Sequence, residues 1–238
     1  MSTLSPSDRS DFLRGIRDTS PLLIGLLPWA LILGMQGGQK GMSWLEMLLM
    51  TGMNFAGGSE FAAVNLWAHP LPVLLIATVT LMINSRHILM GAALAPYLKG
   101  MPLKKVLPAL FFMCDESWAL ALAEARRRKE SALSPVFNLP YYAGAAFVMY
   151  ITWVGFAAFG AAVGPMFGDV AAWGFGMAFP AVFLVLIRGM WTTFTAARPW
   201  LVSLAVAATV RLCSDGAWYV PAGTLAGLAA AYYWGAEQ

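Results

Sequence analysis

The chain is a series of long apolar stretches, most of them close to a membrane span in length, separated by short polar segments. A helix needs about 20 mostly apolar residues to cross the hydrocarbon core of a bilayer. Of the 238 residues, 59% are hydrophobic and 11% are charged, whereas a soluble domain carries about 45–50% apolar and about 25% charged residues. Too few charges are left for a solvated surface. The sequence therefore predicts an all-α integral membrane protein, a polytopic helix bundle with broken helices.

Eight apolar stretches are candidate membrane spans, and we predict about 7–8 transmembrane segments in a single transmembrane domain over residues 1–238. For one or two of them, a re-entrant or broken segment is the alternative to a crossing. Residues 1–19 are predicted to form a cytoplasmic or interfacial N-terminus, and residues 125–138 a hydrophilic loop between the two halves. The candidate spans cover residues 20–38, 44–67, 70–97, 105–124, 139–164, 170–190, 198–213 and 216–234.

The distribution of lysine and arginine predicts orientation, because these residues concentrate in the cytoplasmic loops of membrane proteins. If all eight spans cross and the N-terminus is cytoplasmic, nine of these residues lie inside and five lie outside. This bias predicts that both termini are cytoplasmic. Lys99, Lys104 and Lys105 fall on the outer side in that topology, and a segment that does not cross would change their side.

A short internal similarity is compatible with an internal repeat. Residues 52–56, GMNFA, resemble residues 176–180, GMAFP, with three identities in five positions. Many secondary transporters are built from repeats whose helices are interrupted at matching places.

The stretch at residues 55–61, FAGGSEF, interrupts an apolar span with two glycines and an acid. Each glycine destabilises a helix by about 1 kcal/mol relative to alanine, so Gly57 and Gly58 allow the backbone to unwind. A helix that starts here would present its positive end to a carboxylate ligand. The alternative is close packing through small residues, with Glu60 in a structural hydrogen bond. The predicted substrate-binding residues of this stretch are Phe55, Ala56, Gly57, Gly58, Ser59 and Glu60.

Two further polar clusters lie inside predicted spans, where a charge costs about 2.5–3.5 kcal/mol on insertion scales. In INSRHILM, we predict that Asn84 and Arg86 contact a substrate and that His87 relays protons. The alternative for Arg86 is an ion pair with Glu60 or Asp115. In CDESWALAL, Asp115 and Glu116 are adjacent, so at most one of them faces a given partner. The alternative for both clusters is a position at the membrane surface, where the spans end. The predicted coupling or gating residues are Glu60, His87, Asp115 and Glu116.

The order of these motifs resembles the AzlC family of bacterial branched-chain amino acid permeases. The resemblance rests on FAGGSEF, on INSRHILMGAALAPYL and on CDESWAL ahead of a basic loop, and it covers about residues 15–231. It implies a secondary transporter that exports valine, leucine, isoleucine and their analogues across the bacterial inner membrane, with proton coupling. It also implies a heteromeric complex with a small AzlD-type membrane subunit. Many members of the family carry glutamine where this chain has Glu60.

Other classes of function fit the sequence less well. An intramembrane enzyme would need a nucleophile with a base or a set of metal ligands, but the chain has two histidines and no HExxH or GxSxG motif. We therefore expect no enzyme activity, no cofactor and no metal site. A non-transporting sensor or assembly subunit is the other alternative, in which the intramembrane charges bind a partner helix. The expected partners are branched-chain amino acids, the AzlD-type subunit and lipid, with no nucleic acid.

Overall fold

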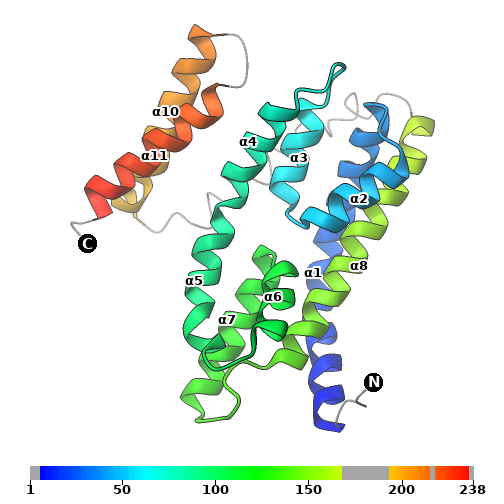
Figure 1. Ribbon diagram of the computed structural model, residues 1–238, viewed down its shortest axis with the longest axis vertical. Helices are drawn as coiled ribbons and strands as arrows, with labels where there is room; N and C mark the ends of the chain where they lie inside the picture. The colour runs from blue at the N-terminus through cyan, green and yellow to red at the C-terminus, as the bar shows by residue number, and fades with distance from the viewer. Residues whose placement is uncertain (1–5, 168–192, 215–217, 236–238) are drawn as a thin grey trace.

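The computed structural model describes residues 6–167, 193–214 and 218–235. Within these ranges the chain is helical and contains no β-strand (Figure 1). Three helical stretches are long and apolar enough to cross a membrane, and they agree with the predicted all-α membrane fold. These stretches are Ser7–Gln39, Val73–Leu98 and Leu139–Phe167.

Helices α1 (Pro6–Gln39) and α8 (Leu139–Val163) pack closely along their length and run in the same direction. A Cβ atom added to Gly15 would collide with the backbone of α8 near its start, and one added to Gly34 would collide with the backbone at Ala157. Glycines therefore let the two backbones approach each other, as small residues do between membrane helices.

Helices α2 (Trp44–Asn54) and α3 (Gly57–Leu66) form a hairpin that enters and leaves at the same end of the bundle. Lys40, just before α2, donates hydrogen bonds from Nζ to the backbone carbonyls of Asn65 (2.7 Å) and Trp67 (3.4 Å). The start and the end of the hairpin are therefore neighbours. Its turn points toward the middle of α8 (Figure 1).

Helices α4 (Val73–Asn84) and α5 (Arg86–Leu98) carry the chain to the opposite end of the bundle. Ser85 between them keeps helical backbone angles (φ −56°, ψ −23°). The two helices therefore continue one another as a single apolar stretch that is long enough to cross a membrane.

Helices α6 (Leu103–Phe111) and α7 (Asp115–Glu130) form a second hairpin at this opposite end. Lys99, just before α6, and Lys129, near the end of α7, line one pocket, so the two ends of this hairpin are neighbours as well. The start of α1 lies at the same end, because α7 forms an ion pair with Arg14 (2.8 Å). The two hairpins thus enter the bundle from opposite ends, and their turns approach each other.

Two of the eight predicted spans, about 44–67 and 105–124, therefore form hairpins whose two ends are neighbours, which is the shape expected in the re-entrant alternative. This geometry moves Lys99, Lys104 and Lys105 to the end that holds the start of α1. Ten of the fifteen lysines and arginines gather there, and we name this the basic end. Its residues are Arg9, Arg14, Arg17, Lys99, Lys104, Lys105, Arg126, Arg127, Arg128 and Lys129.

Helices α10 (Phe194–Cys213) and α11 (Tyr219–Gly235) form an antiparallel pair beside α4. The predicted span 170–190, which includes the second copy of the GMNFA-like motif, lies outside the described residues. Residues 6–19, predicted as a separate interfacial segment, are the first turns of α1.

Candidate functional site

Three interruptions of helical structure meet beside the middle of α8. The first is the α2–α3 turn at residues 55–56, and the second is the boundary between α4 and α5 at Ser85, where the chain continues in the same direction. The third is the α6–α7 turn at residues 112–114. Both turns contact the ring of Tyr150, which lies midway along α8. We name this region the central site.

The backbone of the α2–α3 turn is strained. Phe55 has left-handed angles (φ 45°, ψ 48°), a conformation that favours glycine and costs other residues about 1–2 kcal/mol. Its ring is buried in the apolar core, and this burial offsets the strain. Gly57 begins α3, where an added Cβ atom would lie 3.0 Å from the ring of Trp153. Gly57, at which the sequence predicts a break in the helix, therefore also allows the turn to pack against α8 because it has no side chain.

Glu60 is fully buried and closes the α2–α3 turn through hydrogen bonds. Its Oε1 accepts from the backbone N–H of Ala56 (3.0 Å) and from Nδ2 of Asn54 (3.4 Å), and its Oε2 accepts from Nε1 of Trp153 (2.6 Å). The positive end of α3 is therefore already faced by a carboxylate of the chain itself. The sequence allows two roles for Glu60, substrate binding and a structural hydrogen bond. The contacts seen here are of the second kind.

Asn54 links this turn to the break between α4 and α5. Its Nδ2 donates to Oγ of Ser59 (2.8 Å), and its Oδ1 accepts from Nδ2 of Asn84 (2.8 Å). Ser59 is fully buried and donates in turn to the carbonyl of Ala56 (2.9 Å). The polar side chains of α2, α3 and α4 thus form one connected network, in which each bond supports the next.

The four polar residues 84–87 lie in the middle of the α4–α5 stretch, not at its end. Arg86 forms an ion pair from Nη1 to Oδ2 of Asp115 at the start of α7 (2.8 Å). Nδ1 of His87 lies 3.1 Å from the backbone oxygen of Asn84. Asn84 therefore connects α4 to the first hairpin turn, and Arg86 connects α5 to the second.

The α6–α7 turn is capped by polar groups of its own. The backbone N–H of Cys114 donates to Oγ of Ser117 (2.9 Å), which is fully buried. Asp115 and Glu116 follow as the first residues of α7. Asp115 pairs with Arg86, whereas Glu116 is exposed. The two adjacent acids thus have different surroundings, as expected for successive residues of a helix.

Two buried polar atoms of the central site have no hydrogen-bond partner among the residues that the structure describes. They are Oδ1 of Asn84, an acceptor, and Nε of Arg86, a donor. An unpaired buried donor or acceptor costs about 1–3 kcal/mol. A polar ligand that supplied both missing partners would therefore be stabilised here.

The sequence profile of the AzlC protein family matches residues 21–167, which is more than half of the chain and includes all three interruptions. The chain belongs to the AzlC family. This membership confirms the resemblance drawn from the motifs, and at the level of the family it implies branched-chain amino acid transport.

Two of the curated relatives that match this AzlC-family chain are named as membrane proteins. The chain is 27% identical over 197 residues to the branched-chain amino acid transport protein AzlC of Bacillus subtilis (strain 168), and the aligned region covers 77% of this chain and 70% of the relative. It is 25% identical over 181 residues to the inner membrane protein YgaZ of Escherichia coli (strain K12), which covers 73% and 70%. An uncharacterized membrane protein of Archaeoglobus fulgidus is 27% identical over 160 residues, which covers 67% and 66%. No solved structure matches the chain.

Several residues of the central site in this AzlC-family chain are not predicted from its sequence, among them Asn54, Phe112, Tyr150 and Trp153. Tyr150 and Trp153 lie in the middle of the predicted span 139–164, whereas interfacial aromatic residues gather at the ends of spans. That position is the signal that marks them as internal. For Asn54 the signal is an amide directly before FAGGSEF, inside an apolar run.

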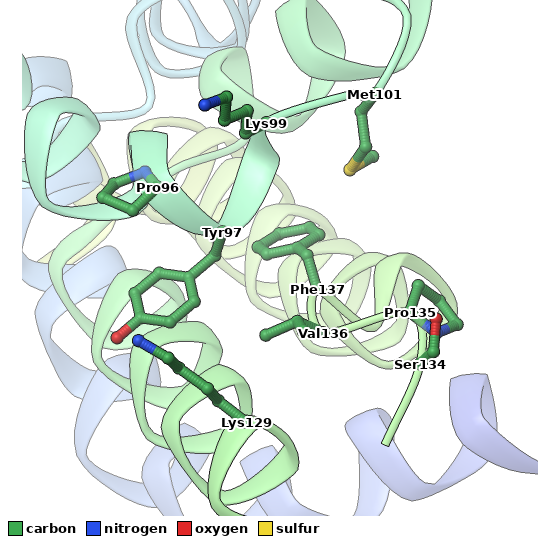
Figure 2. A pocket seen from close by; sticks show the side chains of 9 residues that line it. All are labelled: Pro96, Tyr97, Lys99, Met101, Lys129, Ser134, Pro135, Val136 and Phe137. Atoms are coloured by element: carbon green, nitrogen blue, oxygen red, sulfur yellow. The ribbon is translucent and has the colours of Figure 1, made fainter. Parts of the chain in front are cut away.

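A pocket of about 360 Å³ lies at the basic end, at the base of the α6–α7 hairpin. Figure 2 shows the amine of Lys129 beside the hydroxyl of Tyr97, with Lys99 apart from both. The ammonium groups of Lys99 and Lys129 in this pocket suit an anion and not an aliphatic zwitterion. The pocket is separate from the central site. Among the described residues, no group of three or more histidine, cysteine or acidic side chains is placed to hold a metal ion.

Proposed function

We propose that this protein is the large membrane subunit of a secondary transporter that exports branched-chain amino acids across the bacterial inner membrane, coupled to protons. It acts together with a small AzlD-type membrane subunit. Membership of the AzlC family and the name of the Bacillus subtilis relative support this proposal. Broken helices that meet inside a bundle also support it, because secondary transporters commonly bind substrate at such places.

The observation that carries the proposal is the pair of unpartnered polar atoms, Oδ1 of Asn84 and Nε of Arg86. An amino acid presents an ammonium group, which donates hydrogen bonds, and a carboxylate, which accepts them. Asn84 suits the ammonium group, and Arg86 suits the carboxylate because guanidinium–carboxylate hydrogen bonds are charge-assisted. The two atoms complement the two charged groups that all amino acids share.

The aliphatic side chain of the substrate lies, in this proposal, against the aromatic residues of the two turns. The ring of Tyr150 contacts the rings of Phe55 and Phe112 there, so this part of the site is apolar. A hydrophobic pocket distinguishes one methylene by only about 1–3 kcal/mol, so valine, leucine and isoleucine should compete with one another. Lysine should be excluded, because its second ammonium group would be buried without a partner.

Proton-coupled export requires that the proton and the amino acid exclude each other from the same site. A zwitterion bound to Arg86 through its carboxylate can place its ammonium group against Asp115, the ion-pair partner of Arg86. This attraction exists only while Asp115 is ionised. A proton on Asp115 and an amino acid therefore compete, and His87 beside Arg86 is the proposed proton relay. Asp115→Asn should raise the KM for leucine in counterflow, because the attraction to the ammonium group is lost, and should abolish its acceleration by a proton gradient.

We assign the basic end to the cytoplasm. Ten of the fifteen lysines and arginines gather there, and cytoplasmic surfaces of membrane proteins carry such an excess. In this orientation the α6–α7 hairpin enters from the cytoplasm and the α2–α3 hairpin from the outside. Exported amino acids then enter along α6–α7 and leave along α2–α3.

Counterflow of labelled leucine in proteoliposomes tests the proposed function. The protein is reconstituted alone and together with its co-encoded small membrane neighbour, and valine and lysine serve as competitors. We expect saturable exchange in the pair that valine inhibits and lysine does not. Absence of exchange in both preparations, with helical and monodisperse protein, would contradict the transporter proposal. Full exchange by this chain alone would contradict the need for the small subunit.

A further inference from the structure

Tyr150 contacts both hairpin turns from the middle of α8. Its ring lies edge-on to Phe55, with centroids 5.2 Å apart, and edge-on to Phe112, with centroids 5.0 Å apart. Its hydroxyl donates a hydrogen bond to the carbonyl of Gly52 in α2 (2.9 Å). One side chain thus joins two hairpins that enter the bundle from opposite ends.

We infer that Tyr150 is the seal between the two half-pathways of the transporter, and that it positions the two turns so that one stays closed while the other opens. The inference rests on the proposed function, in which a solute passes the central site. A path through the bundle has to pass where the turns meet. Asn84 and Arg86 contact the two turns from the α4–α5 side, and Tyr150 contacts them from the α8 side.

The contacts of Tyr150 suit a seal that opens on the α6–α7 side. Three aromatic rings in contact form an apolar constriction, and such constrictions exclude water and ions. The two ring contacts are similar in geometry, but the hydrogen bond to Gly52 adds a third contact on the α2–α3 side only. Tyr150 should therefore stay with α2–α3, and the contact with Phe112 should be the one that opens from the basic end.

The test measures proton entry into proteoliposomes without any amino acid, using a pH-sensitive dye trapped inside and a potassium diffusion potential. Tyr150→Ala removes the ring, and we expect a proton flux at least about tenfold above that of the unmodified protein. Tyr150→Phe keeps the ring and loses only the bond to Gly52, so its flux should stay close to that of the unmodified protein. Ile151→Ala, at a neighbouring position of α8 that is 54% exposed, is the matched control and should not leak.

Tyr150→Leu keeps the test decisive if the alanine variant does not fold, because leucine fills much of the space without forming aromatic contacts. Folded Tyr150→Leu should leak as well. A flux like that of the unmodified protein in the folded variants would overturn the inference, and so would an equal leak from Ile151→Ala.

The assay contains no amino acid, so its result is independent of leucine counterflow. If the unmodified protein exchanges leucine and Tyr150→Ala does not leak, the seal is wrong and the proposed function stands. If the unmodified protein does not exchange leucine but Tyr150→Ala leaks, the seal stands and the proposed substrate is wrong.

Discussion

The α2–α3 and α6–α7 hairpins enter the bundle in the same way but are held at different places. In α2–α3 the polar contacts gather at the turn, where Ser59 and Glu60 are both fully buried. Asn54 donates a hydrogen bond to each of them, and Trp153 of α8 donates one to Glu60. This hairpin is therefore fixed in the middle of the bundle.

In α6–α7 the strongest polar contacts lie at the base of the hairpin. Glu124 is 7% exposed and pairs with Arg14 of α1 and with Arg127, both at 2.8 Å. At the turn, the ion pair between Asp115 and Arg86 joins side chains that are 37% and 29% exposed. This hairpin is fixed at the basic end and held less firmly in the middle.

The difference indicates which turn moves. Breaking the contacts of the α2–α3 turn leaves buried donors without an acceptor, at about 1–3 kcal/mol for each. The ion pair of the α6–α7 turn can be exchanged for another charged partner, such as a substrate. We therefore expect α2–α3 to form the static side of the central site and the turn of α6–α7 to form its moving side.

The largest effect should come from removing the carboxylate of the static turn. Glu60→Ala leaves the backbone N–H of Ala56 and the indole N–H of Trp153 without an acceptor, so we expect the free energy of unfolding to fall by about 2–4 kcal/mol. Glu60→Gln should cause about half of this loss, because its amide keeps only one of the two acceptor oxygens that the three donors face. Thermal unfolding in detergent measures both variants.

Asp115→Asn provides the matched change in the other hairpin. It leaves an acceptor for Arg86, so we expect the free energy of unfolding to fall by less than about 1 kcal/mol. Equal losses from Glu60→Ala and Asp115→Asn would mean that the two turns are held equally firmly, and the comparison between the hairpins would be wrong.

Transport should be more sensitive to substitution of Arg86, in the proposed binding site, than to substitution of Glu60, which should mainly affect stability. Arg86→Gln removes the proposed carboxylate-binding group, and we expect leucine counterflow to fall at least about tenfold, which corresponds to about 1.4 kcal/mol. Arg86→Lys keeps the charge but loses the planar donor geometry, so part of the activity should be retained. Glu60→Gln, compared per amount of folded protein, should retain more counterflow than Arg86→Gln. If folded Glu60→Gln is the less active of the two, Glu60 takes part in coupling and its role is not only structural.

The positions of the interruptions could be predicted from the sequence, because each contains residues that are unfavourable inside a membrane helix. Gly57 and Gly58 lower helix stability, and Arg86 and Asp115 carry charge into an apolar run. The structure places an interruption of helical structure at or beside each of these residues. The ion pair between Arg86 and Asp115 is also among the pairings that such charges suggest.

The reversal of the chain at two of these interruptions could not be predicted. An apolar stretch of about 20 residues satisfies the length of one crossing helix and of two short helices that turn back, so hydropathy does not separate them. The contact between Lys40 and Asn65 that closes the first hairpin joins residues 25 positions apart. The bond between Trp153 and Glu60 joins residues 93 positions apart. The outward position of Lys99 in an eight-span topology is the sequence signal of the first reversal, because a chain that turns back at about residues 44–67 brings Lys99 to the side of the N-terminus.

A smaller effect should follow from weakening the base of the α6–α7 hairpin. Glu124→Gln removes the charge that holds Arg14, but Arg14 keeps its contact with Asp11 (3.0 Å), so we expect a loss of about 1–2 kcal/mol in the free energy of unfolding. The central site is unchanged, so the maximal rate of counterflow should change while its KM does not. Glu130→Gln, at an exposed position of the same helix, is the control and should change neither. A shift in KM alone would mean that Glu124 takes part in substrate binding and does not only hold the base of the hairpin.

The smallest effect tests whether the static turn depends on close packing. Gly57→Ala should raise the stability of α3 by up to about 1 kcal/mol through helix propensity, but its Cβ atom would lie 3.0 Å from the ring of Trp153. The ring has to shift and weaken its bond to Glu60, so we expect the two effects to cancel within about 1 kcal/mol.

Gly155→Ala on α8 is the control for this cancellation, because nothing lies within 4 Å of its added Cβ atom. This variant should gain stability from the higher helix propensity of alanine without a clash, so it should unfold at a higher temperature than Gly57→Ala. Thermal unfolding of the two variants side by side measures the difference. If Gly57→Ala gains as much as Gly155→Ala, Trp153 yields freely, and the α2–α3 turn is not held by its packing against α8. The hydrogen bonds of Glu60 would then be the contacts that distinguish the static hairpin from the moving one.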